Sequence, residues 1–243
     1  MLTENKFSKY LIYALGEIVL VVIGILIALA INNGNQNRIL KKKEQTYLKG
    51  LKREFQTSKL KLNELIQVNK RSYNGAKQII QYISNENELP TEIQFSDLLF
   101  NTFSSDVAFN PNNSLLNEMI SSGSLKDISN ANLRLLLTNW ISTIEDISKQ
   151  ENELGTQREK VLDMFRANDY SIRTIFNLTN VSKDLGLVKY DNNISNLSLI
   201  KSTEFENNLL MFILTSYATE KAHYQPLMLD LNSILDLIET EIN

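Results

Sequence analysis

The chain contains 243 residues with a formal net charge of −3, only eight glycines and three prolines, and no cysteine. So few glycines and prolines argue against a turn-rich β-sandwich or β-barrel and favour long helices. The absence of cysteine excludes disulfide bonds, thiolate metal sites and a cysteine nucleophile.

The first predicted element is an apolar run from Leu11 to Ile31, in which Glu17 is the only charged residue. At about 1.5 Å per residue the run spans roughly 32 Å as a helix, enough to cross a hydrocarbon core about 30 Å thick. Tyr10 and Tyr13 lie at one end, where aromatic rings prefer the headgroup region. We therefore predict a transmembrane anchor within residues 1–37, with the lipid bilayer as its partner.

A cleaved signal peptide is the main alternative, because Ala28-Leu29-Ala30 has the small-x-small form of a signal peptidase site. Against this alternative, Glu17 interrupts the apolar run, and the run is longer than a signal peptide needs. A basic cluster also follows the run, as expected for a stop-transfer sequence. A retained single-pass anchor is the favoured interpretation.

One face of the anchor carries a carboxylate, which inside a bilayer costs on the order of 2–3 kcal/mol even on lenient insertion scales. Helical spacing places Glu17, Val21, Gly24 and Ala28 on one stripe. Gly24 and Ala28 form a small-xxx-small pair that permits close helix approach. We predict that this stripe is an intramembrane packing face for a homodimer or a membrane-protein partner. In the alternative, Glu17 reaches toward the headgroups and the small residues are incidental.

A basic segment follows the anchor, with nine lysines and arginines but only two glutamates between Arg38 and Lys61. Its first members, Arg38, Lys41, Lys42 and Lys43, are predicted to contact anionic lipid headgroups, at about 1 kcal/mol each. A solvated helix face is the alternative. Nucleic acid is not expected as a partner, because base-stacking aromatics are few and the apolar residues here are spaced to form a packing stripe.

The remainder, residues 38–243, is predicted to be one helical soluble domain. Heptad spacing predicts a long helix from Arg38 to Ile83, continuous with the anchor or separate from it, that ends before Pro90. Its apolar stripe comprises Leu48, Leu51, Phe55, Leu62, Leu65, Ala76, Ile79 and Ile83, with polar interruptions at Ser58, Asn69 and Ser72.

Shorter elements are expected after this helix. Two short helices are predicted over Ile93–Phe103 and Asn113–Ile120. Gly123 fits a helix end that needs a positive φ, and Ser129 or Asn130 fits the N-cap of the helix that follows.

Two further heptad arrays predict long helices on either side of a polar connection over residues 168–196, in which only a short helix near Ile172–Leu178 is expected. The first array consists of Leu133, Leu137, Trp140, Ile144, Ile147, Leu154, Val161 and Phe165, interrupted by Glu151 and Arg158. The second array consists of Leu210, Leu214, Tyr217, Tyr224, Met228, Leu231, Leu235, Ile238 and Ile242. Lys221 lies inside the second stripe, and Pro226 is expected to kink or split that helix.

Three long helices with one apolar stripe each must bury those stripes against one another. The predicted fold class is therefore all-α: an N-terminal transmembrane helix followed by an antiparallel helical bundle with long coiled-coil-like helices. An intermolecular coiled coil through the membrane-proximal helix is the alternative, and the two arrangements can coexist.

Four segments carry a family resemblance: Glu4–Tyr10, Gly16–Asn33, Asn110-Pro111 and Ser121–Leu137. Together they resemble an uncharacterised family of single-pass membrane proteins common in Bacteroidota, although Gly34 stands where that family usually has tryptophan. The resemblance implies an anchor in a bacterial cytoplasmic (inner) membrane, followed by a helical domain. It implies no known activity.

The side of the membrane that the domain occupies is left open by two opposing indications. Lys6 and Lys9 precede the apolar run, and many more basic residues follow it, so the positive-inside rule alone places the domain in the cytoplasm. Members of the resembled family look as though they begin with a further basic stretch, which would favour an extracytoplasmic domain.

Catalytic chemistry has few candidates in this chain. His223 is the only histidine, and we expect it to be a surface or stripe residue of a helix. No phosphate-binding glycine loop or zinc-protease motif is present. Glu145, Asp146, Glu151 and Glu153 are expected to form a solvated helix face whose members diverge too far to hold a metal. We therefore predict no enzymatic activity and no cofactor.

The function predicted from the sequence is that of a membrane-anchored helical module for interaction or scaffolding. A single-pass ligand-sensing helical bundle is the alternative.

Overall fold

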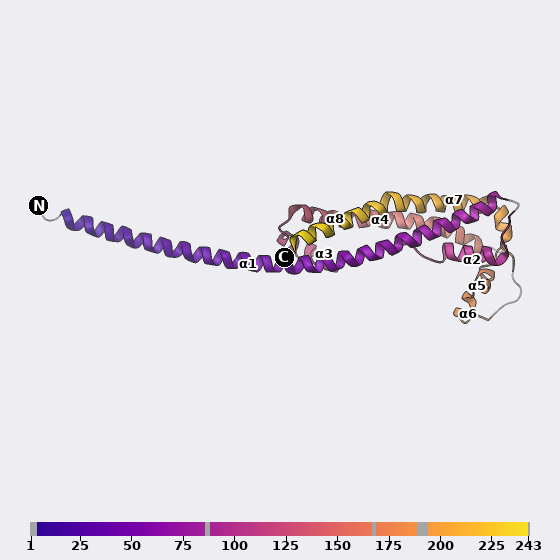
Figure 1. Cartoon of the computed structure of the whole chain (residues 1–243), viewed down its shortest axis with the longest axis horizontal. Coiled ribbons are helices and arrows are strands. Elements are labelled where there is room, and N and C mark those ends of the chain that lie inside the picture. The colour runs from indigo at the N-terminus through magenta and orange to yellow at the C-terminus, as the bar shows by residue number, and fades with distance from the viewer. Residues whose placement is uncertain (1–3, 86–87, 167–168, 189–193, 243) are drawn as a thin grey trace.

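The computed structural model describes residues 4–85, 88–166, 169–188 and 194–242. Every regular element in these ranges is helical, so the predicted all-α class is confirmed. Figure 1 shows a bundle of helices from one end of which a single long helix projects. That helix, α1, runs unbroken over Glu4–Ser84, so the apolar run and the long heptad helix are one element. It ends in the polar stretch before Pro90, as expected.

Within the described residues the bundle has four legs, and each leg runs opposite to the one before it. The first leg is the C-terminal half of α1. The second leg comprises α2 (Glu92–Phe103), α3 (Ser114–Ser121) and the 3-10 helix η1 (Ser124–Asp127). Thr102 lies beside Gly75, whereas Asp127 pairs with Lys43. Residue numbers therefore rise along the second leg as they fall along α1, which makes these two legs antiparallel.

The third and fourth legs are both long. They comprise α4 (Ala131–Asp163) with η2 (Met164–Arg166), and then α7 (Thr203–Ala218), the π-helix η4 (Thr219–Tyr224) and α8 (Gln225–Glu241). Asn130 donates to Glu241 at 2.8 Å, and Gln150 donates to Thr219 at 3.0 Å, so these legs are also antiparallel. Figure 1 places the C-terminus beside the point where α1 enters the bundle. The result is an up-down-up-down bundle.

The connection between the third and fourth legs contains the short helix α5 (Ile172–Leu178), as predicted. It also contains α6 (Val181–Asp184) and the 3-10 helix η3 (Leu197–Lys201), which the sequence pattern did not predict. Asn196 is fully buried. Its side chain accepts a hydrogen bond from the Ser171 backbone N–H at 2.8 Å and donates one to the Ser171 carbonyl at 2.9 Å. Residues 168 and 189–193 of the predicted connection lie outside the described residues.

The stripe predicted for the first leg forms the core. Its central members are fully buried: Leu48, Leu51, Phe55, Leu62, Ala76 and Ile79. The rings of Phe55 and Trp140 meet across the bundle with centroids 5.1 Å apart. The polar interruptions are buried as well, namely Ser58, Asn69 and Ser72. These polar residues need partners inside the bundle, because an unpaired buried polar group is destabilising.

Two local predictions around the start of α4 are confirmed. Gly123 has φ of +69°, a conformation that L side chains rarely adopt, and it separates α3 from η1. The Asn130 side chain accepts a hydrogen bond from the backbone N–H of Leu133 at 3.0 Å, so it is the N-cap of α4.

The stripe predicted for the fourth leg is wrong in its N-terminal half. Leu210, Leu214 and Tyr217 are exposed, and Lys221 also faces solvent. The buried face of α7 consists instead of Phe205, Leu209, Phe212, Thr215 and Ser216. The π-helix between α7 and α8 inserts one extra residue, so a heptad register fitted to α8 is displaced by one when it is extended back through α7. Pro226 lies in the first turn of α8, directly after the π-helix. The expected interruption of the helix is therefore a π-helix beside the proline, which has no N–H to donate.

The prediction that Glu151 belongs to a solvated face of α4 is also wrong, since only 8% of this residue is exposed. Glu145, Asp146 and Glu153 are exposed, as expected. Glu151 differs because it occupies a stripe position of α4 and therefore points into the bundle.

Candidate functional site

The N-terminal half of α1 is exposed, and over Leu11–Ile31 it is apolar on all sides except at Glu17. Residues 8–43 are all exposed. Among the described residues α1 is the one helix long and apolar enough to cross a membrane, and none of its apolar window is buried. A core helix of a soluble domain would bury at least one face of such a window. The apolar run of α1 is therefore an exposed surface whose hydration is unfavourable.

The four residues predicted for intramembrane packing lie on this exposed half of α1. Glu17, Val21, Gly24 and Ala28 occupy successive turns of one continuous helix. A Cβ atom added at Gly24 would meet nothing within 4 Å. The stripe is thus fully accessible, and its glycine leaves room for a second helix to approach closely.

The residues predicted for headgroup contact divide into two groups. Arg38, Lys41 and Lys42 are exposed on the part of α1 that precedes the bundle. Lys43 instead pairs with Asp127 of η1, with Nζ 2.8 Å from Oδ2, and this hydrogen bond raises the pKa of Lys43. Its ammonium also lies 5.6 Å from the ring centroid of Tyr47. The structure therefore places Lys43 in the bundle and leaves the first three cations available for another partner.

The joint between α1 and the bundle is fixed by side chains directly after the basic residues. Glu44 accepts a hydrogen bond from the backbone N–H of Ser129 at 2.6 Å. Gln45 donates to the backbone carbonyl of Glu241 at 2.7 Å. Lys52 forms an ion pair with Glu239. Because contacts to two other legs begin within one helical turn, the joint is fixed, and the projecting half continues from it as one unbroken helix.

A layer of buried polar groups crosses the bundle at the π-helix, and sequence reasoning missed it. It consists of the buried residues Asn69, Tyr73, Glu151, Ser216, Thr219, Glu220 and Tyr224 with the half-buried Gln150, and is referred to below as the polar layer. Glu220 is 1% exposed, and its Oε2 atom accepts a hydrogen bond from the Tyr73 hydroxyl at 2.9 Å. Its Oε1 atom forms an ion pair with Lys70 Nζ at 3.5 Å. Burial and the bond to Glu220 raise the pKa of Tyr73 to about 12.

Glu151 forms the other half of the polar layer. Its Oε1 atom accepts two hydrogen bonds, from the Tyr224 hydroxyl at 2.6 Å and from the Phe109 backbone N–H at 2.9 Å. Burial raises the pKa of Glu151, and these two hydrogen bonds oppose the rise. Burial also raises the pKa of Tyr224. A glutamate at a heptad position was the signal in the sequence that could have located this layer.

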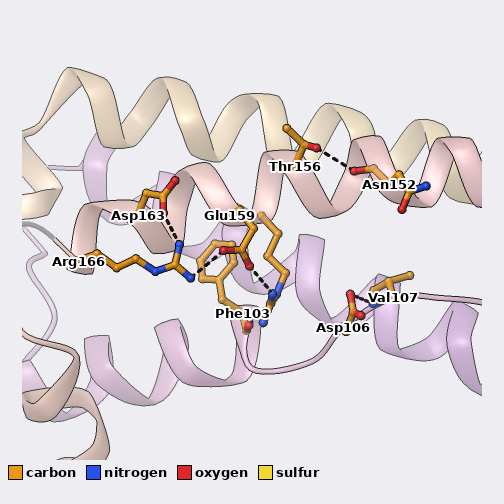
Figure 2. Close-up of polar contacts among 9 residues, drawn as sticks. Phe103, Asp106, Val107, Asn152, Thr156, Glu159, Asp163 and Arg166 are labelled. Atoms are coloured by element: carbon orange, nitrogen blue, oxygen red, sulfur yellow. Dashed lines mark hydrogen bonds and ion pairs between the residues drawn. The ribbon is translucent and has the colours of Figure 1, made fainter.

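A chain of alternating charges runs along the outer face of α4 (Figure 2). Arg158 donates through Nε to the carbonyl of Phe103 at 2.9 Å and pairs with Glu159 at 3.1 Å. Arg166 pairs with Glu159 at 2.8 Å and also with Asp163. These contacts tie the second leg to α4 and neutralise one another, so they offer no unpaired catalytic group.

An apolar pocket of about 240 Å³ lies between α2, the end of α4 and α5. Its lining comprises Leu99, Phe100, Phe103, Ser104, Arg158, Leu162, Phe165, Ile172, Ile175 and Phe176. A pocket with this lining could hold a small apolar group. In the part of the chain that the structure describes, no cluster of three or more histidines and carboxylates could hold a metal ion.

Comparison with known proteins gives one match. The sequence model of a family of unknown function, DUF6090, matches residues 17–146, which is more than half of the chain. The matched range begins at Glu17, includes the joint between α1 and the bundle, and ends within α4. Searches of curated proteins and of solved structures found no match. The chain therefore belongs to the family of unknown function DUF6090.

Proposed function

We propose that this chain is a single-pass membrane protein of the bacterial inner membrane whose helical bundle serves as an interaction or scaffolding module. The observation that carries the proposal is the change of surroundings along α1. The helix is apolar on all sides and exposed over Leu11–Ile31, yet from Leu48 onward it buries a single stripe. A bilayer would surround the first part with apolar lipid, whereas the core of the bundle surrounds the apolar stripe of the second part.

The rigid joint supports retention of the anchor over cleavage as a signal peptide. α1 continues as helix through Ala28-Leu29-Ala30 and reaches the bundle without a turn. Cleavage there would leave an exposed helix end from about Ile31 to Lys42 that packs against no other described part of the bundle. The family resemblance noted in the sequence, to single-pass proteins of Bacteroidota, supports the same conclusion.

Fractionation of the full chain in a bacterial host tests the anchor. We expect the protein to stay in the membrane pellet after carbonate washing and to keep its own N-terminus. A mature N-terminus near Ile31, or release into the supernatant, would contradict the proposal. Protease protection in spheroplasts then distinguishes a cytoplasmic bundle from an extracytoplasmic one.

We infer that the anchor also supplies contacts. The exposed stripe of Glu17, Val21, Gly24 and Ala28 suits a second copy or a membrane-protein partner. The exposed cations Arg38, Lys41 and Lys42 suit anionic headgroups, worth about 1 kcal/mol each near the surface.

The stripe is tested by association of the full chain in mild detergent. Glu17→Leu and Gly24→Leu should each reduce association, because one removes the polar contact and the other fills the close approach. Val19→Leu, on another face of the same run, is the matched control and should change nothing. Unchanged association in both stripe variants would refute the packing role.

Catalysis is not part of the proposal. The buried carboxylates, Glu151 and Glu220, are hydrogen-bonded to tyrosines of the bundle. His223 has no carboxylate neighbour among the described hydrogen bonds and ion pairs. The carboxylates hold helices of the bundle together through these hydrogen bonds. A scaffolding function requires no catalytic role for them.

The second candidate function is ligand sensing, and the apolar pocket between α2, α4 and α5 is the observation that favours it. Affinity purification of the full chain in mild detergent separates the two functions. A stoichiometric protein partner supports scaffolding. A thermal shift induced by a small apolar molecule, without such a partner, supports sensing.

A further inference from the structure

Helix α7 carries a second apolar face that the bundle leaves exposed. Leu210, Met211, Leu214 and Tyr217 form this α7 face, and each is between 46% and 61% exposed. The segment Asn207–Thr219 contains no charged residue at all. Water-facing helix surfaces normally carry charges, whereas interface cores are depleted of lysine, glutamate and aspartate and enriched in aromatic residues and methionine. The composition of the α7 face is therefore that of an interface core.

We propose that the α7 face binds the same face of a second copy of this chain, side by side in one membrane. This inference rests on the proposed anchor, because the anchor fixes how two copies are oriented. α1 is rigidly joined to the bundle, so copies in one membrane have their bundles, and hence their α7 helices, pointing in the same direction.

A twofold axis along the membrane normal then pairs each α7 residue with its own equivalent. Leu210, Leu214 and Tyr217 follow one another at spacings of four and three residues. That spacing is the one that interdigitates along a parallel two-helix seam. The four side chains that meet in such a pair are uncharged, so charge lies only at the Tyr217 edge, where the ammoniums of Lys77 and Lys221 are 5.8 and 5.7 Å from the ring centroid.

The charges at the ends of the α7 face would suit the opposite direction. Glu204 and Glu206 lie before the face, and Lys221 lies after it, with its ammonium 5.7 Å from the Tyr217 ring centroid. An antiparallel pair would match these ends. Exposed ion pairs, however, contribute only about 0–1 kcal/mol. Antiparallel copies would send their anchors in opposite directions, which a single bilayer forbids, so the anchor decides the orientation.

The size of the face explains why the pair needs the membrane. The exposed parts of the four side chains amount to roughly 400 Å² a copy, about half of what a standard stable interface buries on each partner. Alone, such a face holds two soluble copies weakly. Confinement of two copies to one membrane raises the effective concentration of each α7 face near the other, which strengthens the pairing without any new contact.

Single cysteines test the pair cleanly, because the natural chain has none. Leu210→Cys, Leu214→Cys and Tyr217→Cys are introduced separately into the full chain, and native membranes are oxidised with copper phenanthroline. In a parallel pair each of these cysteines faces its equivalent within disulfide range. We expect all three variants to form covalent dimers at least tenfold faster than Ser148→Cys, an exposed control on α4.

Each other pattern overturns the proposal in a recognisable way. Rapid dimer formation by Leu214→Cys alone would show an antiparallel pair, since only the central residue then meets itself. Rates equal to the Ser148→Cys control at all three positions would show that copies do not meet at this face. If carbonate-washed membranes still retain the chain in these cases, only the pairing fails; if the chain is released, the proposed function fails with it.

A second variant separates pairing from folding. Leu214→Glu, placed in the Leu210→Cys background, should slow the cross-link at least tenfold, because it puts two like charges into the apolar face. Leu214 is 61% exposed, so the thermal unfolding midpoint of the bundle should stay unchanged. A cross-link rate unaffected by Leu214→Glu would contradict the proposal.

Discussion

The two halves of α1 form one helix, but they differ in how apolar residues are distributed around it. Over Leu11–Ile31 apolar side chains point in every direction and are exposed on every face of the helix. In the half that follows, apolar side chains recur at heptad spacing and only that stripe is buried. Glycines show the same contrast: a Cβ at Gly24 would meet nothing within 4 Å, whereas a Cβ at Gly75 would lie 2.2 Å from Thr102. The angular spread of apolar residues, more than helix propensity, separates the two environments.

Carboxylates extend the comparison. Glu151 lies in an apolar stripe and receives two hydrogen bonds from its own chain. Glu17 also lies among apolar residues, but the described residues give it no hydrogen bond or ion pair. A buried charge needs such partners. The same requirement is met inside the fold at Glu151, and on our proposal it is met by another helix or by the headgroups at Glu17.

The largest expected effect comes from placing charges in the first half of α1. Val22→Arg combined with Leu26→Arg should disfavour insertion by about 6 kcal/mol, since each arginine costs roughly 3 kcal/mol at the centre of a span. Carbonate extraction should then move the chain from the pellet to the supernatant. Gln36→Arg combined with Leu40→Arg adds the same charge outside the apolar run and should leave the chain in the pellet. Retention of the first variant would break the comparison between the halves.

The matching experiment in the second half of α1 should affect the bundle alone. Phe55 is fully buried and its ring packs on Trp140. Phe55→Ala should lower the free energy of unfolding by about 3–5 kcal/mol, measured by urea unfolding of the full chain in mild detergent. Membrane retention should not change. Leu60→Ala, on the exposed face of the same helix, is the control and should cost about 0.5 kcal/mol or less.

A smaller effect distinguishes the internal carboxylate from an ordinary core residue. Glu151→Ala should cost about 2–3 kcal/mol, because it leaves the Tyr224 hydroxyl and the Phe109 N–H without an acceptor. Both hydrogen bonds end on one oxygen, which glutamine also offers. Glu151→Gln should therefore keep the fold and, at pH 7, be as stable as the wild type or more stable, since no buried charge remains. Glu145→Gln, exposed on the same helix, is the control.

The pH dependence of these variants has a defined sign. The pKa of Glu151 is raised in the folded state above its ordinary value of 4.5, mainly by burial. Its contribution to stability is therefore full below pH 4.5 and declines as pH rises through the folded pKa. The advantage of Glu151→Gln over the wild type should shrink as the pH is lowered from 7 toward 4.5. An advantage that grows on acidification would contradict the assigned shift.

Much of this fold could be predicted because its pattern is local. The stripe of the first leg, the α4 cap at Asn130 and the positive φ at Gly123 all depend on residues within a few turns of one another. The exposure of Glu17, Arg38, Lys41 and Lys42 also follows from their local sequence, whereas the contacts assigned to them are proposals. Lys43 could not be assigned, because its partner Asp127 is brought to it only by the fold.

The α7 face and the polar layer were not predicted because both depend on features that periodicity does not report. A heptad pattern assumes one register, and a single inserted residue at the π-helix turns the buried face of α7 by one residue, about 100° around the helix. The polar layer lies at that insertion and joins residues that are far apart in sequence, such as Tyr73 and Glu220. Periodicity reports neither the insertion nor the long-range pairing.

The smallest predicted effect comes from the glycines of α1 and tests the comparison most directly. Gly75→Ala would place a Cβ atom 2.2 Å from the Thr102 hydroxyl oxygen, and Thr102 is 1% exposed. Overpacking of this kind costs about 1–3 kcal/mol, and the better helix propensity of alanine returns about 1 kcal/mol. We therefore expect a net loss of roughly 1 kcal/mol in the free energy of unfolding.

Two comparisons make that small loss decisive. Gly24→Ala has the same propensity gain and no neighbour to displace, so bundle stability should stay within about 0.5 kcal/mol of the wild type. Adding Thr102→Ala to Gly75→Ala should recover part of the loss, because the clashing oxygen is gone and the two substitutions are in contact. Equal losses at Gly24 and Gly75 would mean that both halves of α1 pack against protein, and the division of this helix between lipid and bundle would be wrong.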